Sequence, residues 1–198
     1  MTVKHVFLIA GENNAIWQDV AVNTLPSAYG PPGGEVNLQQ AQPAAKVWDT
    51  QAGAFVDVDA SVNPGPHVAL APWLVEKYGS TVSEPNVYFV LHGVASTGLD
   101  YHDISDSPGV AYSDWSVERY DRSEGTSHLK NFLNTAVSAL DSIVANADTP
   151  SVEGFYWSQG EDDTRGAYAA HRYYYNFLNL HRRVKERLRC GGFYGSRS

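Results

Sequence analysis

The sequence is poor in cysteine, in basic residues and in long hydrophobic runs, and each shortage excludes a class of protein. Cys190 is the only cysteine, so the chain cannot form an internal disulfide, and one thiol says nothing about its redox compartment. Fourteen Lys and Arg stand against 22 Asp and Glu, for a net charge of −8, which argues against a nucleic-acid partner. No apolar run is long enough to cross a membrane, and Val6 to Ala10 is too short for a signal peptide. We therefore expect a soluble chain, made in the cytoplasm, with no signal peptide and no membrane partner; the compartment in which it works is left open.

Aromatic residues are abundant by contrast, with 12 Tyr and five Trp among 198 residues. Such side chains serve cores, and they also form surfaces that stack on sugars or contact other proteins. The length suits one domain with a substantial core. We find no internal repeat and no low-complexity linker, so residues 1–198 are expected to form a single domain.

Four segments have the apolar composition of strands in a sheet that is covered on both faces. They are residues 5–10, 86–92, 152–157 and, more weakly, 45–48. Three segments have the apolar spacing of helices, namely residues 68–78, 127–145 and 165–188, and Thr126 or Ser127 can cap the second. Strands that alternate with helices predict an α/β fold with a parallel sheet and helices on both faces.

Small and polar residues follow three of the expected strands at the point where each ends. They are Gly11, Glu12, Asn13 and Asn14; Gly93, Ser96, Thr97 and Gly98; and Ser158, Gln159, Gly160, Glu161 and Asp163. The carboxyl ends of parallel strands lie at one edge of a sheet, where open α/β sheets place their ligand crevice. Long loop-like segments at 22–44 and 95–125 follow the same edge, and loops of this length are usually functional or disordered. We therefore expect one site at this edge.

The residues at this edge resemble a known family. The segment Trp157-Ser158-Gln159-Gly160-Glu161-Asp162-Asp163 matches the motif W-H-Q-G-E-x-D, and "GENN" at 11–14 stands where the family has G-Q-S-N. Weaker matches are Gly65-Pro66-His67 before a helix and "SDWS" at 113–116. Over about residues 3 to 189 the chain resembles the SGNH (GDSL-type) hydrolases, most closely carbohydrate esterase family 6 and the sialate O-acetylesterases. The resemblance implies a three-layer α/β/α sandwich with a flavodoxin-like, mostly parallel sheet.

The chain departs from the family at its reacting groups. In the family the serine of G-Q-S-N attacks an acetyl ester, and a histidine from a late D-x-x-H motif takes its proton. Asn13 stands at the nucleophile position here, and a carboxamide has no proton that a base could remove at neutral pH. The chain ends in "CGGFYGSRS", so the final strand and the D-x-x-H segment of the family are missing. His102 is an alternative base, although a solvated acidic loop explains its surroundings better, and no catalytic residue is assigned.

The remaining residues at the edge are expected to bind a ligand. The resemblance and the strand ends assign binding to Gly11, Glu12, Asn13, Asn14, Gly98, Gln159, Gly160 and Glu161, with Trp115 as the best platform for a sugar ring. Glu161 and Asp163 could bind a hard cation, but we favour scaffold roles and capping of the helix that starts near Thr164. No metal and no cofactor are expected.

Three hypotheses follow for the function. The favoured one is a pseudoenzyme, an acetylesterase-like domain that serves as a binding or structural module, for polysaccharide recognition or as part of a virion or surface assembly. The alternatives are an active carbohydrate O-acetylesterase with an atypical site, and an esterase whose sequence is incomplete. Without the family's last strand, residues 152–157 would form a sheet edge with unpaired backbone groups. The expected partners are an acetylated polysaccharide and a protein or second copy of the chain that covers this edge.

Overall fold

The computed structural model describes residues 1–16, 21–95, 97–99, 113–117, 126–160, 163 and 167–190. These residues form a five-stranded sheet with the order β3-β2-β4-β1-β7. Its strands are β1 (Val3–Gly11), β2 (Gln42–Asp49), β3 (Ala54–Val58), β4 (Val87–Gly93) and β7 (Thr149–Ser158). The helices are α1 (Asn13–Ile16), α2 (Pro66–Tyr78), α3 (His128–Ala145) and α4 (Ala167–Cys190), with a 3-10 turn at Val22–Thr24. A separate parallel pair joins β5 (Ser113–Asp114) to β6 (Thr126–Ser127).

The sheet is mostly parallel and is buried at its centre. β2, β4, β1 and β7 run parallel, and β3 joins the outer side of β2 as an antiparallel strand. In β1, Val6, Leu8, Ile9 and Ala10 are at most 1% exposed, as expected for a strand that is covered on both faces. The predicted α/β fold is confirmed. The short strand β3 was missed, although four of its five residues are apolar, because so short an apolar run cannot be assigned to a strand by periodicity alone.

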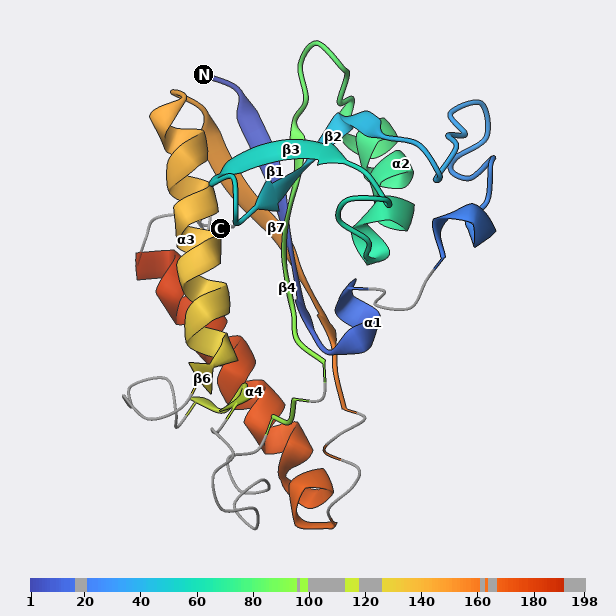
Figure 1. Ribbon diagram of the computed structural model, residues 1–198. Coiled ribbons are helices and arrows are strands. Elements are labelled where there is room, and N and C mark those ends of the chain that lie inside the picture. The colour runs from blue at the N-terminus through green and yellow to red at the C-terminus, as the bar shows by residue number, and fades with distance from the viewer. Residues whose placement is uncertain are drawn as a thin grey trace.

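Helices cover both faces of the sheet (Figure 1). On one face, α2 packs Val68 and Ala71 against a cluster that includes Ile9, Val47 and Phe89. On the other face, α3 and α4 pack an apolar stripe against alternate residues of β1, β4 and β7. The side chains of this stripe are Leu129, Phe132, Leu133, Ala136, Leu140, Leu180, Val184 and Leu188.

Local sequence explains where the helices begin and end. The Lys130 N–H donates to Ser127 Oγ at 3.2 Å, so Ser127 caps α3 as predicted. Pro66 is the first residue of α2, a position that suits its fixed φ and missing N–H. Gly79 ends α2 with φ 62°, a left-handed conformation that glycine adopts without strain.

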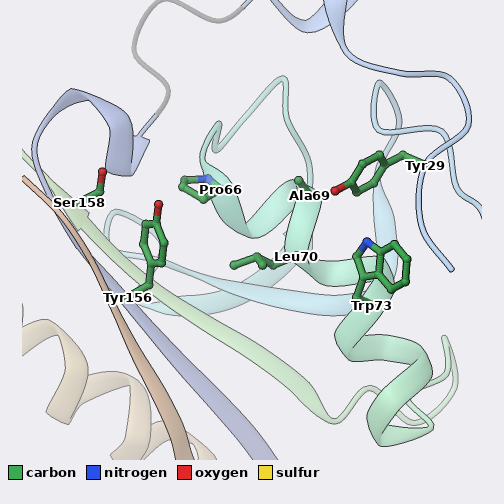
Figure 2. Close-up of a pocket in the computed structure, with 7 residues that line it drawn as sticks. All are labelled: Tyr29, Pro66, Ala69, Leu70, Trp73, Tyr156 and Ser158. Carbon is green, nitrogen blue, oxygen red and sulfur yellow. The ribbon is translucent and has the colours of Figure 1, made fainter.

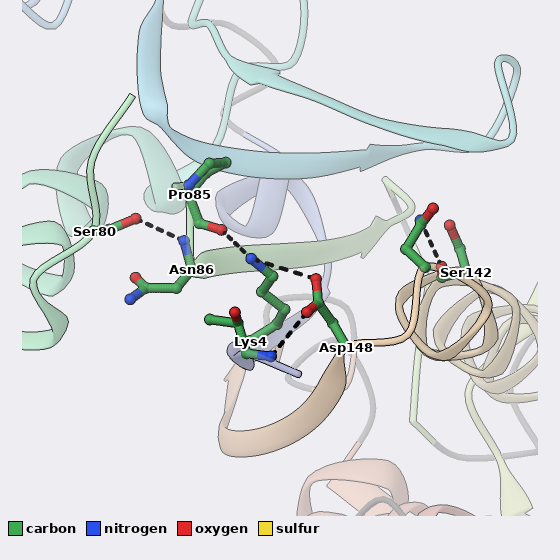
Figure 3. Close-up of polar contacts among 8 residues, drawn as sticks. Lys4, Ser80, Pro85, Asn86, Ser142 and Asp148 are labelled. Atoms are coloured by element: carbon green, nitrogen blue, oxygen red, sulfur yellow. Dashed lines mark hydrogen bonds and ion pairs between the residues drawn. The ribbon is translucent and has the colours of Figure 1, made fainter. Parts of the chain in front are cut away.

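The amino-terminal end of the sheet is held by polar contacts (Figure 3). Lys4 Nζ donates to the Pro85 carbonyl at 2.8 Å and lies 3.5 Å from an Asp148 carboxylate oxygen. The Thr2 N–H donates to the same carboxylate at 3.0 Å, and these two partners hold the pKa of Asp148 below its usual value. The contacts tie β1 to the segments before β4 and β7, which is a structural role at the end opposite to the expected site.

Within the described part of the chain, β7 is an edge strand, as predicted for residues 152–157. What covers that edge stays a prediction. No helix among these residues has the length and hydropathy that a bilayer span needs.

Candidate functional site

The carboxyl ends of β1, β4 and β7 meet at one edge of the sheet. Gly11 at the end of β1 is in register with Gly93 of β4 on one side and with Ser158 of β7 on the other. After β1 the chain turns toward the α2 face, where Ala15 joins the apolar cluster, whereas the next helix after β4 is α3 on the opposite face. Adjacent strands whose connections leave toward opposite faces open a crevice at their carboxyl ends. The structure therefore brings the predicted strand ends together.

Gly11 allows the backbones of β1 and β7 to approach closely at this edge. Its φ of 141° is unfavourable for other residues, and a Cβ at this position would overlap the Ser158 carbonyl oxygen. The next residue, Glu12, donates its N–H to that same carbonyl at 2.8 Å. The glycine is thus required by the close approach of two strands.

The Glu12 side chain joins the end of β1 to the loop after β4. It is 2% exposed, and its Oε1 accepts the Thr97 N–H at 3.1 Å. The Thr97 hydroxyl in turn donates to the Val94 carbonyl at 2.8 Å. A buried carboxylate that accepts a backbone N–H satisfies a group that would otherwise be costly to bury, so Glu12 holds the loop in place.

Gln159 and Asp163 bind the same loop from the β7 side. Gln159 Nε2 donates to the Thr97 carbonyl at 3.1 Å and also to Asp163 Oδ2. The Asp163 carboxylate accepts the Leu99 N–H, at 2.9 Å to Oδ2 and 3.1 Å to Oδ1. These contacts give the buried Asp163 carboxylate a scaffold role between the two loops, and its capping role stays a prediction.

Trp115 is buried and cannot serve as a sugar platform, so that prediction is wrong. Its side chain is 0% exposed and packs edge-on against Trp157, with ring centroids 5.0 Å apart. Trp115 Nε1 donates to Thr97 Oγ1 at 3.0 Å, and its backbone N–H donates to the Gly98 carbonyl at 3.0 Å. The ring is apolar core beneath the crevice, with its one polar atom satisfied by the loop.

Two histidines lie beside Trp115 beneath the edge. The His92 ring centroid is 5.4 Å from that of Trp115 and 6.0 Å from that of His128. Burial and the neighbouring His128 lower the pKa of His92 to about 4, and burial lowers the pKa of His128. The lowered pKa values favour neutral imidazoles, which suits their packing in the core.

Several predicted site residues lie wholly or partly outside the described residues. His102, Glu161 and Ser96 lie outside them. Asn13 and Asn14 open α1, but their side chains are not among those described. Gly160, with φ 148°, has the Tyr173 ring beside it, and Tyr173 donates its hydroxyl to the Gln159 carbonyl at 2.6 Å. The binding roles of these residues stay predictions.

Two hollows adjoin this edge. The smaller, of about 300 Å³, is lined by Gln159, Gly160, Asp163, Ala170 and Tyr173. The larger is an open groove of about 530 Å³ between α2 and β7 (Figure 2). We call it the aromatic groove, and its lining residues are Tyr29, Pro66, Ala69, Leu70, Trp73, Tyr156 and Ser158.

The aromatic groove contains residues that sequence reasoning did not assign to the site. Tyr29, Trp73 and Tyr156 are 37%, 45% and 46% exposed, although aromatic side chains are more often buried. The only signal in the sequence was the high number of tyrosines, which does not say which of them are exposed. Among the described residues, no three His, Cys, Asp or Glu are placed to bind a metal ion.

Comparison with known proteins supports the fold and no closer relationship. No protein-family model and no curated protein sequence matches the chain. A solved structure of a protein from Arabidopsis thaliana is similar with a TM-score of 0.60 and 11% identity, over 94% of this chain and 69% of that one. The crystal structure of NanS is similar with a TM-score of 0.55 and 14% identity, over 95% of this chain and 62% of NanS. At such identities the likeness shows a shared fold alone, and the chain spans about two thirds of either protein's length.

Proposed function

We propose that this chain is a carbohydrate-binding domain with an esterase fold that does not carry out serine-type ester hydrolysis. Its α/β fold is similar to that of NanS. The observation that carries the proposal is that the backbone N–H groups of Glu12, Thr97 and Leu99, at the carboxyl edge of the sheet, are all bound by the protein itself.

Acyl transfer needs N–H donors that point at the developing oxyanion and are not already engaged. Here the Ser158 carbonyl and the carboxylates of Glu12 and Asp163 accept those three N–H groups, at 2.8 to 3.1 Å. A transition state could be stabilised by one of these three N–H groups only if a buried hydrogen bond were broken first. The contacts support a rigid edge of the sheet more than a reacting site.

The chain also lacks a serine at the expected nucleophile position. Asn13 occupies the expected nucleophile position, and an amide donates and accepts hydrogen bonds but cannot be activated as a serine is. Among the described histidines, His67, His92 and His128 have pKa values that burial lowers, and His5 pairs with Glu153 near the other end of the sheet. Loss of one main member of a Ser-His-Asp triad typically lowers kcat by roughly 10⁴-fold or more.

A carbohydrate ligand is proposed from the resemblance in sequence and from the aromatic side chains beside the edge. The resemblance favours an acetylated polysaccharide, and the aromatic side chains suit its sugar rings. Asn13 and Asn14 follow Glu12 in the sequence, and the aromatic groove reaches this end of the sheet at Ser158, whose carbonyl accepts the Glu12 N–H.

The test is an acetyl-ester hydrolysis assay run beside a binding assay. The purified chain, Asn13→Ala and Asn13→Ser are incubated with p-nitrophenyl acetate and with an acetylated oligosaccharide, with buffer alone and an active acetylesterase as references. We expect no turnover above buffer from the parent or Asn13→Ala, and saturable binding of the oligosaccharide by the parent. Turnover by the parent that Asn13→Ala abolishes would overturn the proposal and favour an active O-acetylesterase. Turnover gained only by Asn13→Ser would show that activity was lost at this position.

A further inference from the structure

We infer that the aromatic groove is the binding site for a neutral oligosaccharide chain. The inference rests on the proposed function and assigns a place and a chemical class to its ligand. The groove lies between α2 and the edge strand β7, with Leu70 and Tyr156 facing one another across it and Tyr29 and Trp73 at its far end (Figure 2).

The side chains of the groove fit a ligand that is apolar on its faces and polar at its rim. Tyr29, Trp73 and Tyr156 combine flat apolar rings with an O–H or N–H, and each is more than a third exposed, as is Leu70 at 38%. A pyranose ring has this same division, since its C–H groups form an apolar face and its hydroxyls lie around the edge. An exposed group of large apolar side chains marks a binding surface more often than chance.

The charge of the groove favours a neutral ligand. None of the seven described residues that line it is charged, so this lining offers no counter-charge to a phosphate, a carboxylate or an ammonium group. The net charge of the whole chain is −8, which repels polyanions at long range. A neutral sugar, with or without acetyl esters on its hydroxyls, avoids both difficulties.

The groove is held in shape before any ligand binds. Tyr29 exchanges two backbone hydrogen bonds with Val36, at 3.0 and 2.9 Å. Gly30, with φ 132°, lies so close to Pro72 of α2 that a Cβ would come within 2.9 Å of the proline Cβ. The Tyr29 and Trp73 rings then meet edge-on with centroids 6.5 Å apart. A preformed surface loses less conformational entropy on binding.

The groove is continuous with the carboxyl edge of the sheet. Tyr156 and Ser158 are two residues apart on β7 and so project from the same face, and the Ser158 carbonyl accepts the Glu12 N–H. A sugar chain that lies on Trp73, Leu70 and Tyr156 therefore reaches the carboxyl edge of the sheet, where Asn13 follows β1. The volume of the groove, about 530 Å³, lies within the range of small-ligand sites.

The experiment measures binding of neutral oligosaccharides by isothermal titration calorimetry to the whole chain and to matched variants. The probes are cello- and xylo-oligosaccharides with and without O-acetyl groups, a sialylated oligosaccharide, and a proline-rich peptide, since aromatic grooves also bind such peptides. The groove variants are Trp73→Ala and Tyr156→Ala, on two different elements. Tyr174→Ala and Tyr175→Ala are controls, because these tyrosines are 64% and 65% exposed on α4 and do not line the groove.

We expect each groove variant to weaken binding of a neutral oligosaccharide by about ten-fold or more and each control by less than about two-fold. Trp73→Phe, which keeps a ring, should restore part of the affinity, and circular dichroism checks that every variant is folded. Unchanged affinity in both groove variants would overturn this inference and leave the proposed carbohydrate binding intact. Preference for the sialylated probe or for the peptide would overturn the neutral-sugar assignment. A parent that binds no carbohydrate at all would overturn the proposed function, and this inference with it.

Discussion

His67 is buried near the start of α2, and its imidazole should make the protein less stable in mild acid. The side chain has no exposed surface. Its Nε2 lies 3.4 Å from Asn63 Oδ1, a long contact, and its Nδ1 has no hydrogen-bond partner within the described part of the chain. A charged imidazolium there would lose its hydration and gain few hydrogen bonds to replace it. Burial therefore lowers the pKa of His67 from 6.5 to about 3.

The sign and size of the effect follow from proton linkage. Between pH 6.5 and about 3 the unfolded chain binds a proton at His67 that the folded chain does not, so the free energy of unfolding falls as the pH falls. From pH 7 to pH 5 the loss is about 2 kcal/mol. His92, whose pKa is about 4 for the same reason, acts in the same direction. Most carboxylates stay ionised above pH 5, which isolates the histidines in this window.

The assay is urea unfolding, followed by far-ultraviolet circular dichroism, of the parent and His67→Gln at pH 7, 6 and 5. The Gln amide is neutral throughout and can reach the position of the imidazole Nε2. We expect the parent to lose about 2 kcal/mol more than the variant between pH 7 and pH 5. His171→Gln, at an exposed site on α4, is the control and should follow the parent. Equal losses in the parent and His67→Gln would refute the reasoning, since they would show that His67 takes up its proton without unfolding.

Two further predictions test the edge of the sheet. Gly11→Ala should cost about 3 kcal/mol or more or prevent folding, because a Cβ would overlap the Ser158 carbonyl and φ is 141°; a chemical denaturation curve close to that of the parent would contradict this. Trp115→Phe should cost about 2 to 3 kcal/mol, because it leaves a cavity and removes the Nε1 hydrogen bond to Thr97. The exposed Trp73→Phe is its matched control and should cost much less, and equal losses in the two variants would show that Trp115 is not the packed residue described.

Local pattern was enough for much of the fold. Apolar composition identified β1, β4 and β7 to within three residues at either end, because strands of a covered sheet, such as β1, need apolar side chains at most positions. The spacing of Leu129, Phe132 and Leu133 identified α3, and Ser127 identified its start, because caps and helical stripes depend on residues only a few positions apart. The position of the site also followed from pattern, since parallel strands bring their carboxyl ends to one edge.

The roles of the individual side chains at that edge depended on contacts between distant parts of the chain. Asp163 and Leu99 are 64 residues apart, and Glu12 and Thr97 are 85 apart. Each polar residue was readable from the sequence as a ligand-binding group, a cap or a scaffold, and only its partner in space distinguishes these roles. The burial of Trp115 could not be predicted either, because it depends on which residues pack around the ring and not on the residue itself.

The aromatic groove shows most clearly which features the sequence pattern predicts and which depend on tertiary packing. Tyr29, Trp73 and Tyr156 come from a loop, a helix and a strand, and no spacing in the sequence connects them. The composition of the chain established that tyrosine was plentiful, and its apolar pattern established an α/β sheet with a polar edge. The packing of α2, of the loop around Tyr29 and of β7 then decided which aromatic rings stay exposed together, because exposure depends on what the whole fold leaves uncovered.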